Sequence, residues 1–271
     1  MMVWWNSVSP CLFHNPKFNP ISIFLLYNDF IKVQEVFYAH IRKERDEPVN
    51  YRHEQKHQIN AADLIILRQR LRSVMQQDSH APDGSYLVRS LYFDTPADTA
   101  LREKLDGVNN REKFRLRYYN RDLSMIRLEK KSKHNGLGSK ETARLTAQEV
   151  RSILEGDRQW MKQADRPLIR ELYSKMICQG LQPKTLVDYI REPFVYGPGN
   201  VRVTLDHSIR TGLRCVDFLD PDCVTVPAGD APIILEVKWD AFLPDLIRDM
   251  VQLEGRHTAA FSKYALCRIY D

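Results

Sequence analysis

The chain has 271 residues, of which 43% are hydrophobic and 28% charged, and this ordinary globular composition excludes a wholly disordered or collagen-like protein. Forty lysine and arginine residues against 35 acidic ones give a net charge of +5, which is too small for a chromatin-type protein. Charge placement is therefore more informative than total charge, and one main domain is expected for this length.

The five cysteines are widely spaced and include no C-x-x-C pair, so we expect a reducing compartment and no structural zinc. The apolar run from Ile21 to Tyr27 is far shorter than the ~20 residues that cross a bilayer. The first residues also lack the basic segment that opens a secretory signal. The sequence thus predicts a cytoplasmic protein without a membrane span.

Residues 1–50 differ in composition from the rest of the chain. Aromatic residues are scattered among prolines there, and no spacing in the segment indicates chemistry. We interpret it as an N-terminal extension, which is either an added docking helix or the product of a misassigned start. Short alternating segments begin at residue 51, so residues 51–271 form the predicted main domain.

Helices are predicted where a capping residue precedes apolar residues at helical spacing. Asn60 precedes one such run, and Thr146 with Glu149 forms a capping box before another. Two more helices are expected near Leu168–Gln179 and Leu243–Leu253. The remaining regular segments, at least seven, have the pattern of strands. The predicted fold class is therefore α+β, an antiparallel β-barrel that carries peripheral helices.

Several predicted strands alternate long charged side chains with large apolar ones. Successive residues of a strand point to opposite faces, so in Arg111–Tyr119 the basic residues share one face and apolar residues the other. The same alternation occurs in Arg52–Lys56, Ile126–Lys133, Arg202–Asp206 and Ile233–Trp239.

A charged strand face usually meets bulk water, and for a single strand that explanation is sufficient. Five such strands with bulky opposite faces favour another arrangement, in which helices cover the apolar faces and the charged faces turn inward. Because unpaired buried charges are costly, the interior must then hold water, carboxylates or a polyanion. The planar guanidinium of arginine makes bidentate hydrogen bonds to oxyanions, and lysine supplies a compact positive charge. A mixture of the two therefore suits a chain of phosphates.

Three glutamates lie on the same alternating segments as the basic residues: Glu54, Glu129 and Glu236. Carboxylate oxygens are ligands for hard divalent ions, which in turn bridge phosphate oxygens. Each glutamate alone is better explained as a salt-bridge partner of its basic neighbours.

Eight short segments follow one another along residues 51–271 in this order: Arg52–Lys56, Ser90–Asp94, Phe114–Tyr118, Leu128–Lys131, Tyr189–Arg191, Arg202–Asp206, Leu235–Lys238 and Ser262–Tyr264. In this order they resemble the VTC domain of polyphosphate polymerases, which belongs to the triphosphate tunnel metalloenzymes. The resemblance rests on the ordered set, since a single segment would be weak.

The resemblance implies an antiparallel β tunnel barrel that binds ATP or another triphosphate, together with polyphosphate and a divalent metal, manganese rather than magnesium. As catalytic residues it implies Arg115, Arg117 and Lys131. As further phosphate-binding residues it implies Lys56, Lys140, Arg191, Arg202 and Lys263. Glu236 would bind the metal, and the additional site candidates are Glu54, Glu129 and Lys238.

The implied reaction is transfer of the ATP γ-phosphoryl group to a growing polyphosphate chain, without a covalent protein intermediate. Hydrolytic members begin with Glu-x-Glu-x-Lys, and Arg52 stands in place of the first glutamate, which favours transfer. An inorganic or nucleoside triphosphatase and a non-catalytic polyphosphate-binding module are the alternatives.

Nucleic-acid binding is a further alternative of a different class, in which Tyr92, Tyr118 and Tyr119 would stack on bases. We do not expect it, because the aromatic residues mostly oppose the basic ones along the strands. The sequence leaves the oligomeric state open.

Overall fold

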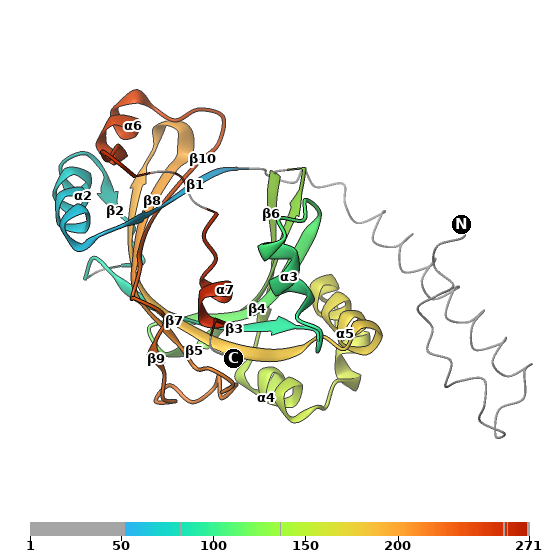
Figure 1. Ribbon diagram of the computed structural model, residues 1–271. Coiled ribbons are helices and arrows are strands. Elements are labelled where there is room, and N and C mark those ends of the chain that lie inside the picture. The colour runs from blue at the N-terminus through green and yellow to red at the C-terminus, as the bar shows by residue number, and fades with distance from the viewer. Residues whose placement is uncertain (1–51, 82, 136, 257, 259, 270–271) are drawn as a thin grey trace, which may run out of the picture. The chain divides into compact units, whose positions relative to one another are not determined.

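The computed structural model describes residues 52–81, 83–135, 137–256, 258 and 260–269. The predicted N-terminal extension, residues 1–50, lies outside them. The described part is a single curled sheet with most of its helices packed on its outer side, while the helix Lys263–Cys267 lies within the curl (Figure 1).

Within the described residues, ten strands form one antiparallel sheet. Eight of them follow the spatial order β1-β10-β8-β7-β3-β4-β5-β6, while β2 pairs with β7 and β9 pairs with β8. The strands are His53–Ile59 (β1), Gln76–Gln77 (β2), Tyr86–Asp94 (β3), Arg111–Tyr119 (β4), Asp122–His134 (β5), Leu137–Leu145 (β6), Gln182–Tyr196 (β7), Val201–Thr211 (β8), Val226–Pro227 (β9) and Ile233–Trp239 (β10).

The sheet curls until its two edge strands, β1 and β6, approach each other (Figure 1). Arg52, immediately before β1, forms an isolated antiparallel bridge with Gly138 of β6. The architecture is therefore an incomplete barrel whose edges meet at this bridge. The prediction of an antiparallel α+β barrel with peripheral helices is confirmed.

Two helices begin at the capping residues that the sequence predicts. Asn60 accepts a hydrogen bond from the Asp63 amide, and Thr146 accepts one from the Glu149 amide, each within a reciprocal capping box. None of the described helices is long and apolar enough to span a membrane. The helices are Ala61–Val74 (α2), Thr99–Leu105 (α3), Ala147–Glu155 (α4), Pro167–Gln179 (α5), Asp245–Val251 (α6) and Lys263–Cys267 (α7), with 3-10 turns at Gln159–Gln163 (η2) and Pro198–Asn200 (η3).

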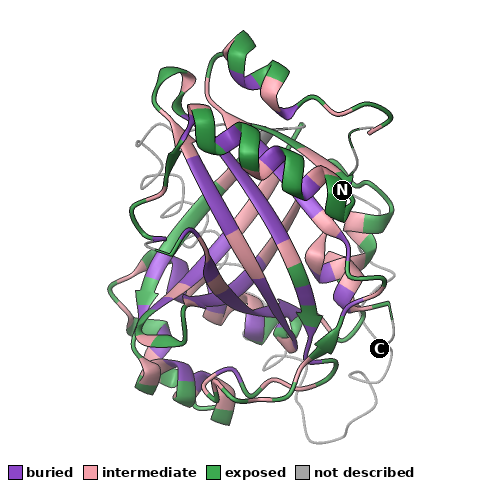
Figure 2. Ribbon diagram, turned by 90° about the vertical axis from the view of Figure 1, so that its left-hand side faces the viewer, coloured by how far each residue is buried: buried purple, intermediate pink, exposed green. Residues whose placement is uncertain are grey.

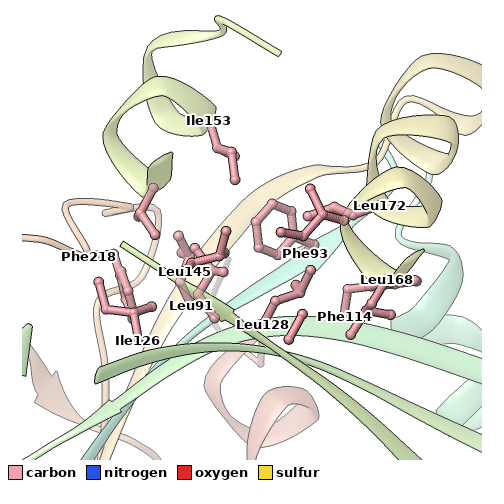
Figure 3. Packing of buried hydrophobic residues seen from close by; sticks show 14 of the residues in the cluster. Leu91, Phe93, Phe114, Ile126, Leu128, Leu145, Ile153, Leu168, Leu172 and Phe218 are labelled. Carbon is pink, nitrogen blue, oxygen red and sulfur yellow. The ribbon is translucent and has the colours of Figure 1, made fainter. Parts of the chain in front are cut away.

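The apolar faces of the strands pack under these helices. Phe114 of β4 and Leu128 of β5 lie in one buried cluster with Ile153 of α4 and Leu172 of α5 (Figure 3). A second cluster joins α2 to β8 and β10, and Figure 2, which looks at that side, shows mostly buried strands passing beneath a helix with an exposed outer face. The charged strand faces therefore point inward, as the alternation predicts.

Truncating one core leucine tests this packing. Leu116 of β4 is 0% exposed in the cluster beneath α4 and α5, whereas Leu105, at the end of α3, is 68% exposed. Leu116→Ala should lower the free energy of unfolding by about 3 kcal/mol because it leaves a cavity. Leu105→Ala should change it by less than about 0.5 kcal/mol. Urea denaturation measures the free energy of unfolding of both variants. Equal losses would contradict the assignment of Leu116 to the buried core and of Leu105 to the surface.

Candidate functional site

The curled sheet encloses a cavity of about 660 Å³, to which all eight strands of the main path contribute side chains. Among the described residues, three glutamates line it, Glu54, Glu112 and Glu236, against fourteen lysines and arginines. We call it the basic cavity, and its basic residues are Arg52, Lys56, Lys104, Arg111, Lys113, Arg115, Arg117, Lys131, Lys133, Lys140, Arg191, Arg202, Lys238 and Lys263.

The structure brings the candidate site residues of the sequence together in this cavity. Eleven of the twelve line it: Lys56, Arg115, Arg117, Lys131, Lys140, Arg191, Arg202, Lys263, Glu236, Glu54 and Lys238. The twelfth, Glu129, is completely buried behind the cavity surface and contacts the basic residues that line it.

Glu129 is the common partner of three cavity cations. It lies opposite Arg115 in the β4–β5 ladder and accepts a hydrogen bond of 2.7 Å from Arg115 Nε. Lys140 Nζ lies 2.6 Å from its other oxygen, and Arg117 lies 3.9 Å away. Burial alone would raise the pKa of Glu129, but Arg115, Arg117 and Lys140 hold it well below its usual value. Glu129 therefore stays ionised and fixes the positions of these three side chains.

Hydroxyl groups from the neighbouring strands complete the positioning of the two buried arginines. Arg115 Nη1 donates to the Tyr92 hydroxyl at 2.8 Å. Arg117 donates to Ser90 Oγ and to the Tyr189 hydroxyl, both at 3.0 Å. The guanidinium groups are thus oriented by the protein itself, which would reduce the entropy lost on binding an oxyanion.

A second carboxylate, Asp206, orders the wall formed by β7 and β8. Arg191 makes a bidentate ion pair with it, with two hydrogen bonds of 2.7 Å, and Lys263 Nζ donates to it at 2.7 Å. Although burial would raise the pKa of Asp206, Arg191 and Lys263 lower it to about 2. Arg191 and Lys263 also lie over the ring of Tyr189, so this wall is fixed by both charge and stacking.

The third acidic centre joins β1 and β10. Glu54 lies opposite Lys238, and Glu236 lies opposite Lys56, so the two glutamates share both lysines. Burial would raise the pKa of Glu236, yet Lys238 and Lys56 keep it well below its usual value. Thr204, beside Glu236 in the ladder, lines the cavity with a buried hydroxyl that has no hydrogen-bond partner among the described residues. These oxygen donors suit a hard divalent cation.

Lys113 is a cavity residue that the family resemblance did not assign. The alternation in Arg111–Tyr119 already placed it on the same face as Arg115. It lies opposite Lys131 in the β4–β5 ladder, and within the described residues no ion pair joins either lysine to a carboxylate. Burial is the main cause that lowers the pKa of Lys113 to about 8, and Lys238 together with burial lowers that of Lys131 well below normal. A bound polyanion would stabilise both charges.

The aromatic residues divide between the two faces of the sheet. Tyr118 packs in the core against Phe218, as expected, with ring centroids 4.8 Å apart. Tyr92 and Tyr119 instead line the basic cavity, so the expectation that aromatic residues oppose the basic ones was wrong for these two. Tyr119 lies on the same face of β4 as its basic residues, and Tyr92 lies on the same face of β3 as Tyr86, where its hydroxyl accepts a hydrogen bond from Arg115.

Arg52, which replaces the first glutamate of the hydrolytic motif, is anchored at the rim. Its Nε atom donates to Asp240 at 2.6 Å, and its Nη2 atom donates to the carbonyl of Asn200. The carboxylate of Asp240 therefore neutralises the charge of Arg52 beside the bridge that joins β1 to β6.

A curled antiparallel sheet that encloses inward-pointing basic side chains is the triphosphate tunnel fold. The family model of the VTC domain matches residues 51–269, and the chain belongs to the VTC domain family. No curated protein matches the sequence.

Three solved structures are similar to this chain at low sequence identity. One is a Hippeastrum protein studied as an adenylyl cyclase and described as having a dominant triphosphatase activity; it has 14% identity and a TM-score of 0.49, and the match covers 80% of this chain and 94% of that one. A Bacillus halodurans protein proposed as an adenylate cyclase has 17% identity and a TM-score of 0.43, with 68% and 78% covered. A Pyrococcus horikoshii protein has 13% identity and a TM-score of 0.42, with 79% and 98% covered.

Removing the two positioned arginines tests the cavity as an anion site. Hydrogen bonds to charged groups contribute about 1.5–3 kcal/mol each, so Arg115→Ala with Arg117→Ala should weaken binding of tripolyphosphate at least about 100-fold. The matched control is Arg121→Ala with Arg144→Ala, which removes the same charge from exposed positions outside the cavity. Calorimetry measures binding, and circular dichroism verifies folding. Retained affinity in the folded double variant would contradict the assignment.

The lowered pKa of Lys113 predicts a pH dependence of binding. A bound polyanion favours the protonated form of Lys113. Above pH 8 the free protein has lost this proton, so binding must take it up again. The affinity for tripolyphosphate should therefore fall by up to about tenfold per pH unit as the pH rises above about 8. Tyr92, whose pKa burial raises but Arg115 and Lys113 lower to about 8, adds to the same trend. Calorimetry from pH 7.5 to 9.5 should show a smaller slope for Lys113→Met, and equal slopes would contradict this origin.

Proposed function

We propose that this chain is a polyphosphate polymerase-like phosphotransferase that transfers the γ-phosphoryl group of ATP to a growing polyphosphate chain. The observation that carries the proposal is the concentration of fourteen lysines and arginines around one enclosed cavity, against three glutamates, among the described residues. A string of phosphates presents negative charge at every unit, and basic side chains from seven of the eight strands of the main path, all but β3, can contact such a string along its length.

Phosphoryl transfer requires mainly alignment and stabilisation of charge, because the protein itself need not form a covalent bond. In our proposal Arg115, Arg117 and Lys131 hold the transferring group. Arg115 and Arg117 are already oriented by Glu129, Tyr92 and Tyr189 and need little reorganisation.

The remaining phosphates of donor and product would be held by the other cavity cations. The acceptor's terminal phosphate oxygen is already anionic near neutral pH, so the reaction does not need a general base. The residues proposed for this role are Lys56, Lys140, Arg191, Arg202 and Lys263.

A divalent cation would be held by Glu236 with Glu54, and manganese is the ion we propose. Both carboxylates are kept ionised by the neighbouring lysines despite their burial. The unpartnered Thr204 hydroxyl offers a further oxygen at the same place. The cation would neutralise charge on the phosphate oxygens.

Arg52 favours transfer over hydrolysis. A first-strand glutamate in its place would add a third carboxylate beside Glu54 and Glu236 for metal-driven activation of water. The cationic side chain instead is tied to Asp240 at the rim. A triphosphatase or a non-catalytic polyphosphate-binding module are the competing functions, and residues 51–271 are the proposed functional unit in each case.

Product analysis separates these functions. The purified chain, incubated with ATP and manganese, should give phosphate polymers that appear as a ladder on a polyacrylamide gel and disappear with exopolyphosphatase. Orthophosphate and ADP without any polymer would instead identify a triphosphatase. Tight polyphosphate binding without turnover would identify a binding module. Either of these last two results would refute the polymerase proposal.

Substituting the proposed metal ligand tests the role of the cation. Glu236→Gln should lower the initial rate at least about 100-fold and weaken manganese binding, because it removes an anionic oxygen donor. Glu155→Gln, exposed at the end of α4, is the control with the same chemical change. Manganese binding followed by electron paramagnetic resonance provides the readout independent of activity. Unchanged manganese affinity in Glu236→Gln would exclude Glu236 as a ligand.

A further inference from the structure

The loop between β8 and β9, residues 212–225, holds two thiols in contact. The Sγ atoms of Cys215 and Cys223 lie 2.8 Å apart, and a carboxylate oxygen of Asp217 lies 3.6 Å from the Cys215 sulfur. Both cysteines are partly exposed, so small molecules in solution can reach the pair.

Local hydrogen bonds and packing fix the two thiols in place. The Cys215 amide donates to the carbonyl of Gly212 at 2.9 Å, and the Cys223 amide donates to the carbonyl of Asp220 at 3.2 Å. Between them Phe218 is fully buried in the main core cluster. The loop therefore closes on itself around an apolar anchor, and the contact between the sulfur atoms follows from that closure.

The loop covers a buried ion pair on the outer side of the sheet. Arg89 of β3 makes a bidentate pair with Asp188 of β7, with hydrogen bonds of 2.9 and 2.8 Å. The same guanidinium donates to the loop carbonyls of Asp220 and Cys223. The residues next in sequence, Ser90 and Tyr189, hold Arg117 in the basic cavity. The loop thus contacts, on the outer face of the sheet, the two strands β3 and β7 whose inner faces position Arg117.

We propose that Cys215 and Cys223 form a reversible intramolecular disulfide that fastens this loop over the Arg89–Asp188 pair. The oxidant is a small-molecule disulfide such as glutathione disulfide. One protein thiolate attacks it, forming a mixed disulfide and releasing one glutathione thiolate. The second protein thiolate then displaces the other glutathione. In total, two protein thiols become one disulfide, and one glutathione disulfide becomes two glutathione molecules, which carry the two protons.

The geometry favours a sulfur–sulfur bond over a bound metal ion. Two thiolates on one tetrahedral zinc ion lie about 3.8 Å apart, given zinc–sulfur bonds of about 2.3 Å. The two sulfur atoms here lie closer together than that. Asp217 is the one other metal-binding side chain grouped with the pair among the described residues. A closed four-ligand site is therefore not formed.

Peptide mapping tests the proposal on the full chain. After treatment with glutathione disulfide, trypsin cleaves behind Arg214 and Lys238 and leaves both cysteines in one peptide, residues 215–238. Without reduction this peptide should be lighter by two hydrogen atoms, and dithiothreitol should restore its mass. Cys215→Ser and Cys223→Ser should each give a glutathione adduct instead. Cys178→Ser, which removes an exposed thiol elsewhere, should leave the result unchanged.

Two results would overturn the proposal. One is a wild-type peptide that carries glutathione on both cysteines and forms no internal bond. The other is a stoichiometric zinc ion that remains through dialysis and protects both thiols.

The effect of the disulfide on the loop is checked separately by thermal unfolding. Oxidation should raise the melting temperature of the wild type by about 5 °C and leave that of Cys223→Ser unchanged. Equal melting temperatures of oxidised and reduced wild type would exclude the fastening.

Discussion

The sharing of a few buried carboxylates among many inward-pointing cations is the constraint on which the basic cavity depends. Lysine and arginine side chains enclosed by a sheet repel one another, and removing them from water is costly. Glu129, Asp206 and the pair of Glu54 and Glu236 each contact two or more cations. They reduce the repulsion without cancelling it, so the enclosed space keeps an excess of positive charge.

This constraint also explains the position of the helices. A strand with a charged inner face has an apolar outer face, and that face is stable only when it is covered. Helices α4 and α5 cover β4 and β5, while α2 covers β8 and β10. The charged interior thus depends on the peripheral helices. By covering the apolar strand faces, they allow the charged faces to line the enclosed space.

Much of this arrangement could be predicted from local sequence signals. The strand Arg111–Tyr119 has the bounds that its alternation indicates, and Asn60 and Thr146 begin the helices that they were expected to cap. The pairing of Arg115 with Tyr92 could not be predicted, because it depends on the register between β3 and β4. The contact of Cys215 with Cys223 was missed for a similar reason, since it depends on how an irregular loop packs around its own apolar residue.

The edges of the sheet have a mechanical consequence. Neighbouring strands of the main path are joined by ladders of five or more residue pairs, whereas β1 and β6 meet in the described residues through the bridge of Arg52 and Gly138. Separating these edges breaks one backbone contact rather than a whole ladder. In the part of the chain that the structure describes, the closure of the barrel therefore rests on a single bridge, whereas the register of the eight-strand wall rests on continuous ladders.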